Sequence, residues 1–355
     1  MINRISFDNF RGIKHLEIPD VSQITLLTGR NNAGKSSILE GIFLFMDHTA
    51  VDSFGKINGF RGLPYAPSPA SLWEPVFFGL DTNNPLRIEM NIDGKKSSLL
   101  YERDDSYIPA DKQGAAQNAY SQFTASTRTT YTLKFSYQQE SYKENGSFSI
   151  NETGFFRNFA TNLKNNQIRF LPGARFISSG IHDDVAVLNW IGKMELQGKK
   201  QQVIDVLRNI EPEITDIITI SNQGQTQVYA KVMNRLLPVK LAGDGLNRLL
   251  FIILAILEEP NSILLIDEID TGFHYSMLKT LWKVVVAAAK ESNCQVIATT
   301  HSYECIDQAV GGIDEAGMLE EFCLYRITHS GEKNTAVRYS GDLVKEAVAS
   351  FMEVR

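Results

Sequence analysis

Short runs of apolar residues, each about as long as a strand, are the clearest feature of the hydropathy pattern. They comprise Ile24 to Leu27, Ser262 to Ile266 and Gln295 to Thr299. Uninterrupted apolar runs of this length are typical of strands buried on both faces of a parallel sheet. Ser37 to Phe45 and Leu249 to Leu257 instead carry apolar residues at helical spacing. The pattern predicts an α/β fold, in which residues 1–50 and 235–355 form a core with a mostly parallel sheet.

The long stretch between the two helical segments begins with a different pattern. Residues 51–150 are predicted to form an antiparallel β lobe, with strands at Leu86 to Ile92, Ser97 to Tyr101, Thr129 to Tyr137 and Ser147 to Ile150. Polar residues that include glycine predict turns at Asp93 to Lys96 and at Glu144 to Gly146. Residues 102–128, rich in Ser, Gln, Ala, Asp and Thr, form a candidate flexible loop.

The second half of this stretch, residues 151–234, is predicted to be a mainly helical insertion lobe. Its expected elements are helices at Asp183 to Glu195 and Lys199 to Asn209, then strand-like pieces at Asp216 to Ile220 and Gln227 to Val232. The lobe also holds basic residues such as Arg157, Lys164 and Arg169 among several phenylalanines. Nucleic-acid binding is one interpretation of this mixture, but a solvated basic face over a phenylalanine-rich core is favoured.

A glycine-rich segment connects the first apolar run to the first helical segment. Gly29 to Ser36 fits the phosphate-binding loop pattern G-x-x-x-x-G-K-[ST]. In such a loop the backbone amides and the following helix N-terminus face phosphate oxygens. Lys35 would neutralise the β- and γ-phosphates, and the Ser36 hydroxyl would bind Mg²⁺. The predicted ATP-binding residues are Gly29, Asn31, Asn32, Ala33, Gly34, Lys35, Ser36 and Ser37. An accidental glycine turn is the alternative, and the strand–loop–helix context speaks against it.

The two other apolar runs end in residues that suit the same chemistry. Asp267 and Glu268 follow the second run, and His301 follows the third. Because ligands bind at the carboxyl ends of parallel strands, these residues should face the phosphate loop. Asp267 would hold Mg²⁺ through water, Glu268 would polarise the attacking water, and His301 would sense the γ-phosphate. The expected catalytic residues are therefore Lys35, Glu268 and His301, and the metal ligands are Ser36 and Asp267. Taken alone, His301 would more often be an ordinary structural histidine.

A fourth element points to a family. The turn Gly243-Asp244-Gly245, followed by Arg248 and a very apolar helix, resembles the signature motif of ABC-type ATPases, in the variant of the overcoming-lysogenization-defect (OLD) group. Phe7 to Gly12 resembles the opening hairpin of RecF, SMC and OLD ATPases, and Asp270 to His274 their head-contact loop. The resemblance implies an ABC-type P-loop fold and a homodimer or higher homo-oligomer in which Gly243, Asp244 and Gly245 bind the partner's ATP. The usual signature serine is absent, with Gly243 near its place. In isolation the segment would be simply a turn.

Composition adds the expectation of a cytoplasmic protein without a membrane segment. The chain has 355 residues and a formal charge of −6. Its three cysteines have no metal-ligand spacing. Its longest apolar run is far shorter than the about 20 residues that span a bilayer. The charge does not exclude a local nucleic-acid groove.

Full-length OLD proteins carry a Toprim nuclease domain after the ATPase, and residues 302–355 are too few to hold one beside the closing strand, Phe322 to Ile327. The resemblance therefore implies a short OLD-like ATPase without that domain. The expected function is an ATP-hydrolysing dimeric sensor or regulator in anti-phage defence or DNA maintenance, which controls a separate nuclease or toxin. The alternatives are an ATP-gated scaffold with negligible turnover, a DNA-repair ATPase of RecF or SMC type and, more distantly, a transporter subunit.

Overall fold

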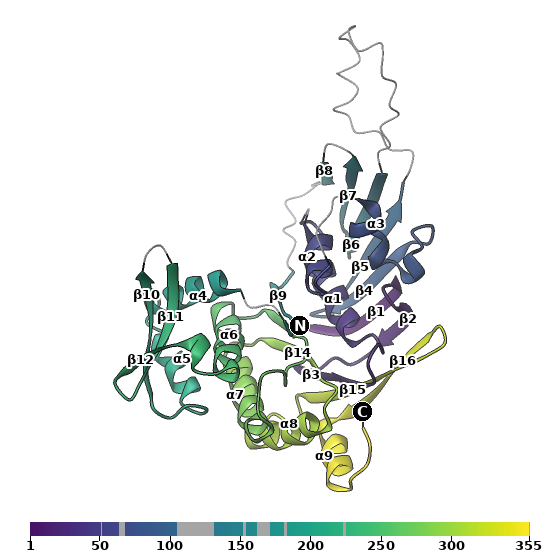
Figure 1. Ribbon diagram of the computed structural model, residues 1–355. Coiled ribbons are helices and arrows are strands. Elements are labelled where there is room, and N and C mark those ends of the chain that lie inside the picture. Colours follow the sequence, from purple (N-terminus) through teal and green to yellow (C-terminus); the bar gives the residue numbers. More distant parts are fainter. Residues whose placement is uncertain are drawn as a thin grey trace, which may run out of the picture.

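The strands of the described residues form three sheets, which Figure 1 shows in a computed structural model. The structure describes residues 1–50, 52–63, 68–104, 131–151, 154–161, 171–180, 183–222 and 225–354. Among the described residues, no helix is long and apolar enough to cross a membrane.

The central sheet contains the predicted apolar strands. Its order is β16-β15-β3-β14-β13-β9. The strands are β3 (Ile24–Thr28), β9 (Ala174–Ile177), β13 (Ile263–Ile266), β14 (Gln295–Thr299), β15 (Phe322–Ser330) and β16 (Lys333–Ser340). All neighbours pair in parallel except β16, which pairs antiparallel with β15. The prediction of a mostly parallel core sheet is confirmed. β9 was not predicted, because it is short and contains the charged Arg175 at the sheet edge.

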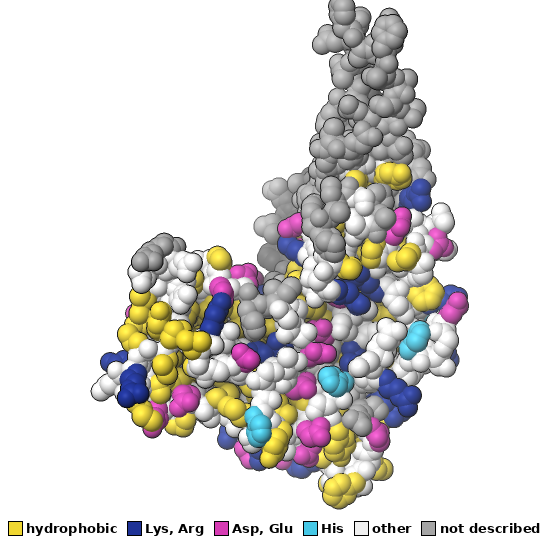
Figure 2. Space-filling view, in the orientation of Figure 1, with side chains coloured by type: hydrophobic (Ala, Val, Ile, Leu, Met, Phe, Trp, Pro, Cys, Tyr) yellow, Lys and Arg dark blue, Asp and Glu magenta, His cyan; other side chains and the backbone are white. Residues whose placement is uncertain are grey.

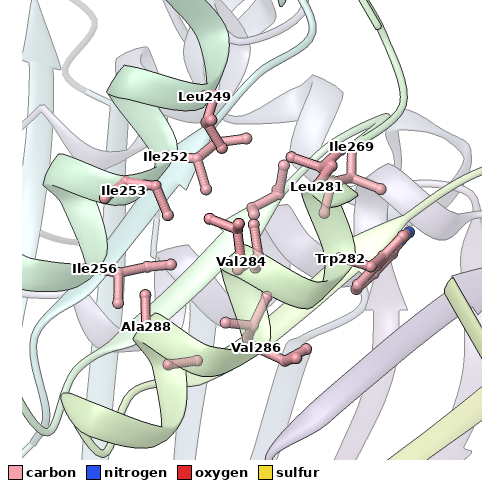
Figure 3. Close-up of a cluster of buried hydrophobic side chains, with 14 of the residues drawn as sticks. Leu249, Ile252, Ile253, Ile256, Ile269, Leu281, Trp282, Val284, Val286 and Ala288 are labelled. Atoms are coloured by element: carbon pink, nitrogen blue, oxygen red, sulfur yellow. The ribbon is translucent and has the colours of Figure 1, made fainter. Parts of the chain in front are cut away.

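Alternate residues of the central strands enter two different cores. Leu264 and Ile266 face one core, and Ile263 and Leu265 face the other. The first core lies under α6 (Asp244–Glu258), α7 (Leu278–Glu291), α8 (Tyr303–Glu315) and α9 (Gly341–Ala349). Figure 3 shows part of it, where apolar side chains of α6 and α7 meet. The second core lies between the sheet, α1 (Lys35–Met46) and the antiparallel sheet. Burial on both faces explains the uninterrupted apolar runs.

The antiparallel sheet has the order β2-β1-β4-β5-β6-β7-β8. Its strands are β1 (Ile2–Phe10), β2 (Ile13–Ile18), β4 (Leu86–Ile92), β5 (Lys95–Arg103), β6 (Tyr131–Gln139), β7 (Tyr142–Asn151) and β8 (Gly154–Thr161). The turn predicted at Asp93 is present, with Asp93 and Gly94 both at positive φ. The turn predicted at Glu144 to Gly146 is wrong, because these residues pair with β6 inside β7. The chain reverses instead at Glu140, which has a φ of 53°. Most of the candidate loop, residues 105–128, lies outside the described residues.

The insertion lobe contains both predicted helices and more strand than expected. α4 (Asp184–Leu196) and α5 (Lys200–Leu207) precede a three-stranded sheet of β10 (Ile214–Asn222), β11 (Gln225–Val232) and β12 (Arg235–Pro238). Figure 2 shows many hydrophobic side chains on the surface of this lobe. Its exposed apolar residues include Leu196, Met233, Leu236 and Leu237.

The division into three domains stays a prediction, and the strand pairing crosses its proposed boundaries. β1 and β2, within residues 1–50, belong to the antiparallel sheet, and β8 extends that sheet beyond residue 150. β9 belongs to the central sheet although it lies in the insertion.

The remaining short helices of the described residues are α2 (Ser53–Gly59) and α3 (Pro69–Leu72), with 3₁₀ turns at Glu74–Val76, Phe78–Leu80, Val239–Leu241 and Tyr275–Met277.

Two buried polar contacts attach the antiparallel sheet and the first helix to the core. The Gln295 amide of β14 accepts from the Ile2 N–H and donates to the Ile2 carbonyl, both at 2.8 Å. Glu40 of α1 pairs with Arg11 at 2.9 Å and with Arg61 at 2.6 Å. Burial lowers the pKa of Arg11, and the neighbouring Glu40 carboxylate opposes this shift. Because Gln295, Arg11 and Glu40 are buried, these contacts hold β1 and α1 against the core.

Two helical glycines provide a test of this packing. A Cβ atom at Gly41 of α1 would lie 2.4 Å from Cε1 of Phe7, whereas at Gly192 of α4 it would meet nothing within 4 Å. We expect Gly41→Ala to lower the free energy of unfolding by about 1–3 kcal/mol, as overpacking does. The matched control Gly192→Ala should raise it by about 0.5–1 kcal/mol through helix propensity. Urea unfolding measures both values, and equal effects of the two substitutions would contradict the packing of α1 on β1.

Candidate nucleotide site

The phosphate loop connects β3 to α1 and is shaped by glycines at positive φ. Gly29 has a φ of 137° and Gly34 a φ of 101°. A Cβ atom at Gly29 would lie 2.2 Å from the carbonyl oxygen of Ile327 in β15, so only glycine fits there. Gly34 is the N-cap of α1 and leaves the first turn without a side-chain cap. The amide N–H groups of that turn are therefore available to an anion, which fits the phosphates of ATP.

Lys35 is buried beneath this loop. Its Nζ donates to the carbonyl oxygens of Gly29 at 2.8 Å and Arg30 at 3.1 Å. Burial lowers the pKa of Lys35, and the nearby carboxylates of Asp267 and Glu268 oppose this shift. A partly desolvated ammonium gains most from an anionic partner. The position of Lys35 therefore fits the phosphate-binding role predicted from the sequence.

Asp267, at the end of β13, meets the phosphate loop through Ser36. The Ser36 hydroxyl donates to Oδ1 of Asp267 at 2.9 Å, and the Thr299 hydroxyl donates to the same oxygen at 2.7 Å. A serine hydroxyl beside a carboxylate is a set of oxygen donors that suits Mg²⁺, which proteins bind through one or two carboxylates together with substrate phosphates. The predicted metal ligands thus lie together. Thr299 was missed by the sequence analysis, although its place at the end of a strand beside His301 is a usable signal.

Glu268 lies beside Asp267 with its backbone in the left-handed region, at a φ of 49°. Its amide N–H donates to Oγ1 of Thr299 at 2.8 Å. Its carboxylate accepts from Thr271 at 3.3 Å and lies 3.9 Å from Nδ1 of His301. The side chains of Glu268 and His301 are 41% and 52% exposed, so both can reach a bound ligand and water. The structure brings the three predicted catalytic residues to one edge of the central sheet.

Arg248 of α6 supports this edge from behind and was given no role in the sequence analysis. It is 2% exposed. Its Nη2 donates to the carbonyl oxygens of Asp267 at 2.9 Å and Glu268 at 2.8 Å, and its Nη1 to that of Ser178 at 3.3 Å. Left-handed backbone costs an ordinary residue roughly 1–2 kcal/mol. The two hydrogen bonds from Nη2 to the carbonyl groups of Asp267 and Glu268 offset this conformational cost.

The signature-like turn lies at the start of α6, and the helix begins earlier than predicted. α6 starts at Asp244, so Asp244 and Gly245 form its first turn and Gly243, at a φ of 120°, is its N-cap. A Cβ atom at Gly243 would meet nothing within 4 Å, whereas one at Gly245 would lie 3.1 Å from the Gly272 carbonyl oxygen. Within the described chain no hydrogen bond joins this turn to the phosphate loop.

The proposed nucleic-acid surface receives little support from the side chains that are described. Arg175 and Lys193 pair with carboxylates of α6, and Lys200 pairs with Asp216 at 2.9 Å. Phe176 stacks on Phe60, with ring centroids 4.1 Å apart. The side chains of residues 154–161 and all of residues 162–170, which include Arg157, Lys164 and Arg169, lie outside the described part. These contacts favour the interpretation of these basic and aromatic residues as a solvated basic face over a phenylalanine-rich core.

A comparison with known families places this site in context. Residues 24–307 match the family described as "AAA domain, putative AbiEii toxin, Type IV TA system". The chain belongs to this family. The match spans the phosphate loop, the signature-like turn and the strands that carry Asp267 and His301.

Related proteins agree with the assignment. A Helicobacter pylori protein named ATP/GTP phosphatase is 24% identical over 348 residues, covering 91% of this chain and 92% of the relative. The fold resembles an Smc head bound to the C-terminal winged-helix domain of ScpA, with a TM-score of 0.52, 12% identity and coverage of 98% and 99%. It also resembles an Smc head with an extended coiled coil bound to the C-terminal domain of ScpA, derived from Pyrococcus furiosus, with a TM-score of 0.50, 11% identity and 99% coverage of both chains. The family match confirms the predicted P-loop ATPase domain, and the resemblance to Smc heads confirms the predicted fold.

Proposed function

We propose that this chain binds ATP with Mg²⁺ and hydrolyses it at the edge formed by β3, β13 and β14. The observation that carries the proposal is the contact of Ser36 and Thr299 with one oxygen of Asp267, directly beside Glu268. This contact supports the assignment of Ser36 and Asp267 as a metal-binding pair and of Glu268 as a carboxylate base beside the phosphate loop. A relative named ATP/GTP phosphatase supports the same chemistry.

Each residue has a distinct role in the proposed reaction. The amides of the phosphate loop and Lys35 bind the β- and γ-phosphates, which orients the γ-phosphoryl group. Mg²⁺, held by Ser36 and through water by Asp267, would neutralise developing charge on the phosphates. Glu268 accepts a proton from the attacking water, and His301 contacts the γ-phosphate. Thr299 orients both acidic residues, because its hydroxyl donates to Asp267 and accepts from the Glu268 amide.

Substitution of Lys35 and Glu268 separates binding from hydrolysis. Lys35→Ala should abolish measurable ATP binding, because it removes the charge that the phosphates require. Glu268→Gln should keep ATP binding within about threefold, since one proton acceptor is lost and the side-chain shape is kept. It should lower the hydrolysis rate by about 10²–10⁴-fold, the range for loss of a general base. Equilibrium binding and phosphate release measure these effects. Unchanged hydrolysis by Glu268→Gln would remove the base assignment and favour another acceptor.

We further propose that the site is completed by a second copy of the chain. Gly243, the N-cap of α6, faces open space, and the turn Gly243 to Gly245 makes no hydrogen bond to its own phosphate loop within the described residues. Such a turn can bind the γ-phosphate of a partner's nucleotide through backbone amides. The fold of the Smc heads supports this arrangement. A constitutive dimer is the alternative, because the usual signature serine is absent.

Self-association should therefore depend on the γ-phosphate. The Glu268→Gln variant should dimerise at least tenfold more tightly with ATP than with ADP, because only ATP offers a differential contact to the opposite turn. Light scattering over a range of protein concentrations measures the shift. A second variant, Gly243→Val, should bind ATP as the parent does but dimerise equally with ATP and ADP. A monomer under every condition would refute the shared site.

The proposed biological role is a sensor or regulator in anti-phage defence or DNA maintenance, which controls a separate effector. The family description, with its reference to a toxin of a toxin–antitoxin system, supports a defence context. The alternatives remain an ATP-gated scaffold and a DNA-repair ATPase of RecF or SMC type. Glu268 favours hydrolysis over a pure scaffold, because its carboxylate lies beside Asp267 and His301.

An effector on a separate protein leads to a simple expectation. The purified chain should not cut plasmid DNA, linear DNA or tRNA in the presence of Mg²⁺ or Mn²⁺, since its proposed metal ligands serve ATP. Gel analysis after prolonged incubation is the measurement. Cleavage that persists in Lys35→Ala and Asp267→Ala would show a second active site within the chain.

A further inference from the structure

A cavity lies between the phosphate loop and the end of β15, and neither Asp267 nor Glu268 lines it. It has a volume of about 420 Å³ and is lined by Gly29 to Ala33 and by Arg326 to His329 at the end of β15. Small-molecule sites usually measure roughly 300–1,000 Å³. None of the predicted catalytic or metal-binding residues lines this cavity. Its proximity to the loop makes it a candidate for the part of a nucleotide that is not phosphate.

The strand order gives the direction in which a bound nucleotide must extend. β3, which leads into the phosphate loop, lies between β14 and β15 in the central sheet. The contact of Ser36 with Asp267 places the metal and γ-phosphate end on the side of β14 and β13. A linear triphosphate held by the loop therefore directs its nucleoside toward the opposite side. The carboxyl end of β15 lies on that side, where the cavity is found.

The β15–β16 hairpin holds the loop in place beside this cavity. The backbone of Ile327 approaches Gly29 so closely that a Cβ atom there would collide with its carbonyl oxygen. Asn334 of β16, which is 6% exposed, donates from Nδ2 to the carbonyl oxygen of Ala33 at 3.4 Å. The wall formed by β15 is thus fixed relative to the phosphate loop. A base bound against that wall would have a defined position.

One side chain of the wall suits a nucleobase. His329 is exposed at the cavity, and imidazole rings stack on bases. Arg326 stands three positions earlier on β15, so its side chain points to the opposite face of the strand. Its guanidinium lies over the Tyr339 ring, with Cζ 6.0 Å from the ring centroid. The Thr328 hydroxyl lies 2.6 Å from that of Thr335, so its interaction is within the hairpin.

We propose that the cavity at the end of β15 is the nucleoside subsite of the ATP site, in which His329 stacks on the base. The proposal rests on the proposed function, because it assigns the rest of the same ligand. It separates the two ends of the nucleotide physically. The phosphates bind to Lys35 and the loop amides, and the nucleoside binds to β15.

Binding of a nucleotide and of bare phosphate chains can test this division. The probes are the non-hydrolysable β,γ-imido analogue of ATP and inorganic tripolyphosphate, each titrated calorimetrically with Mg²⁺ into the full chain. His329→Ala should lower the affinity for the ATP analogue about 5- to 100-fold, the range expected for loss of one base-stacking side chain. Tripolyphosphate affinity should stay within about twofold. Lys35→Ala should weaken both ligands together.

His15→Ala is the matched control, since His15 is an exposed histidine of β2 that pairs with Asp8 and does not line the cavity. It should bind both ligands as the wild type does.

The nucleoside subsite would be refuted if His329→Ala lost affinity for the ATP analogue and tripolyphosphate equally, or lost affinity for neither. A wild-type chain that binds tripolyphosphate and the ATP analogue equally well would overturn it too. Failure of the wild type to bind either ligand would instead refute the proposed function itself. Thermal unfolding of each variant verifies folding, and because His329 is exposed, its removal leaves no buried group unpaired.

Discussion

The hydrogen bonds that converge on one oxygen of Asp267 determine how the functional edge of this protein is built. Ser36 comes from the start of α1, Thr299 from the end of β14 and Asp267 from the end of β13. These segments meet because β3, β14 and β13 run parallel and in register, with Leu27 opposite Thr299 and Ala298 opposite Ile266. Carboxyl ends of parallel strands open onto one crevice. Without that register, the phosphate loop would face no acidic residue.

Arg248 extends this constraint to the opposite side of the functional edge. Its guanidinium joins the first turns of α6 to the backbone of Asp267 and Glu268. The turn at Gly243 begins the same helix, so a ligand that displaces this turn would act on the orientation of Glu268 through a short and buried path. Removal of a buried hydrogen-bonding group leaves its partners unsatisfied at a cost of about 1–3 kcal/mol. Arg248 therefore links the start of α6 to the backbone of Asp267 and Glu268.

The lobes are attached to the core by contacts that leave the functional edge free. Gln295 bonds to the backbone of Ile2, and Glu40 holds Arg11 and Arg61 around α1. Gln295, Glu40 and Arg11 are buried, whereas Arg61 is partly exposed. The antiparallel sheet can therefore vary at its outer strands without changing the phosphate loop.

The sequence by itself determined the parallel strands, the phosphate loop and the acidic pair, because each depends on local spacing. Burial on both faces produces an apolar run, and a phosphate loop needs glycine at fixed positions within a few residues. Only the tertiary structure decided the contacts between segments that are distant in the chain. It assigned Thr299 and Arg248 to the acidic pair, put β8 and β9 into two different sheets and set β15 against the phosphate loop. The turn expected at Glu144 became part of β7, because pairing with β6 outweighed local turn preference. Cross-strand partners and cavity walls depend on register and packing, and no local pattern of residues encodes these.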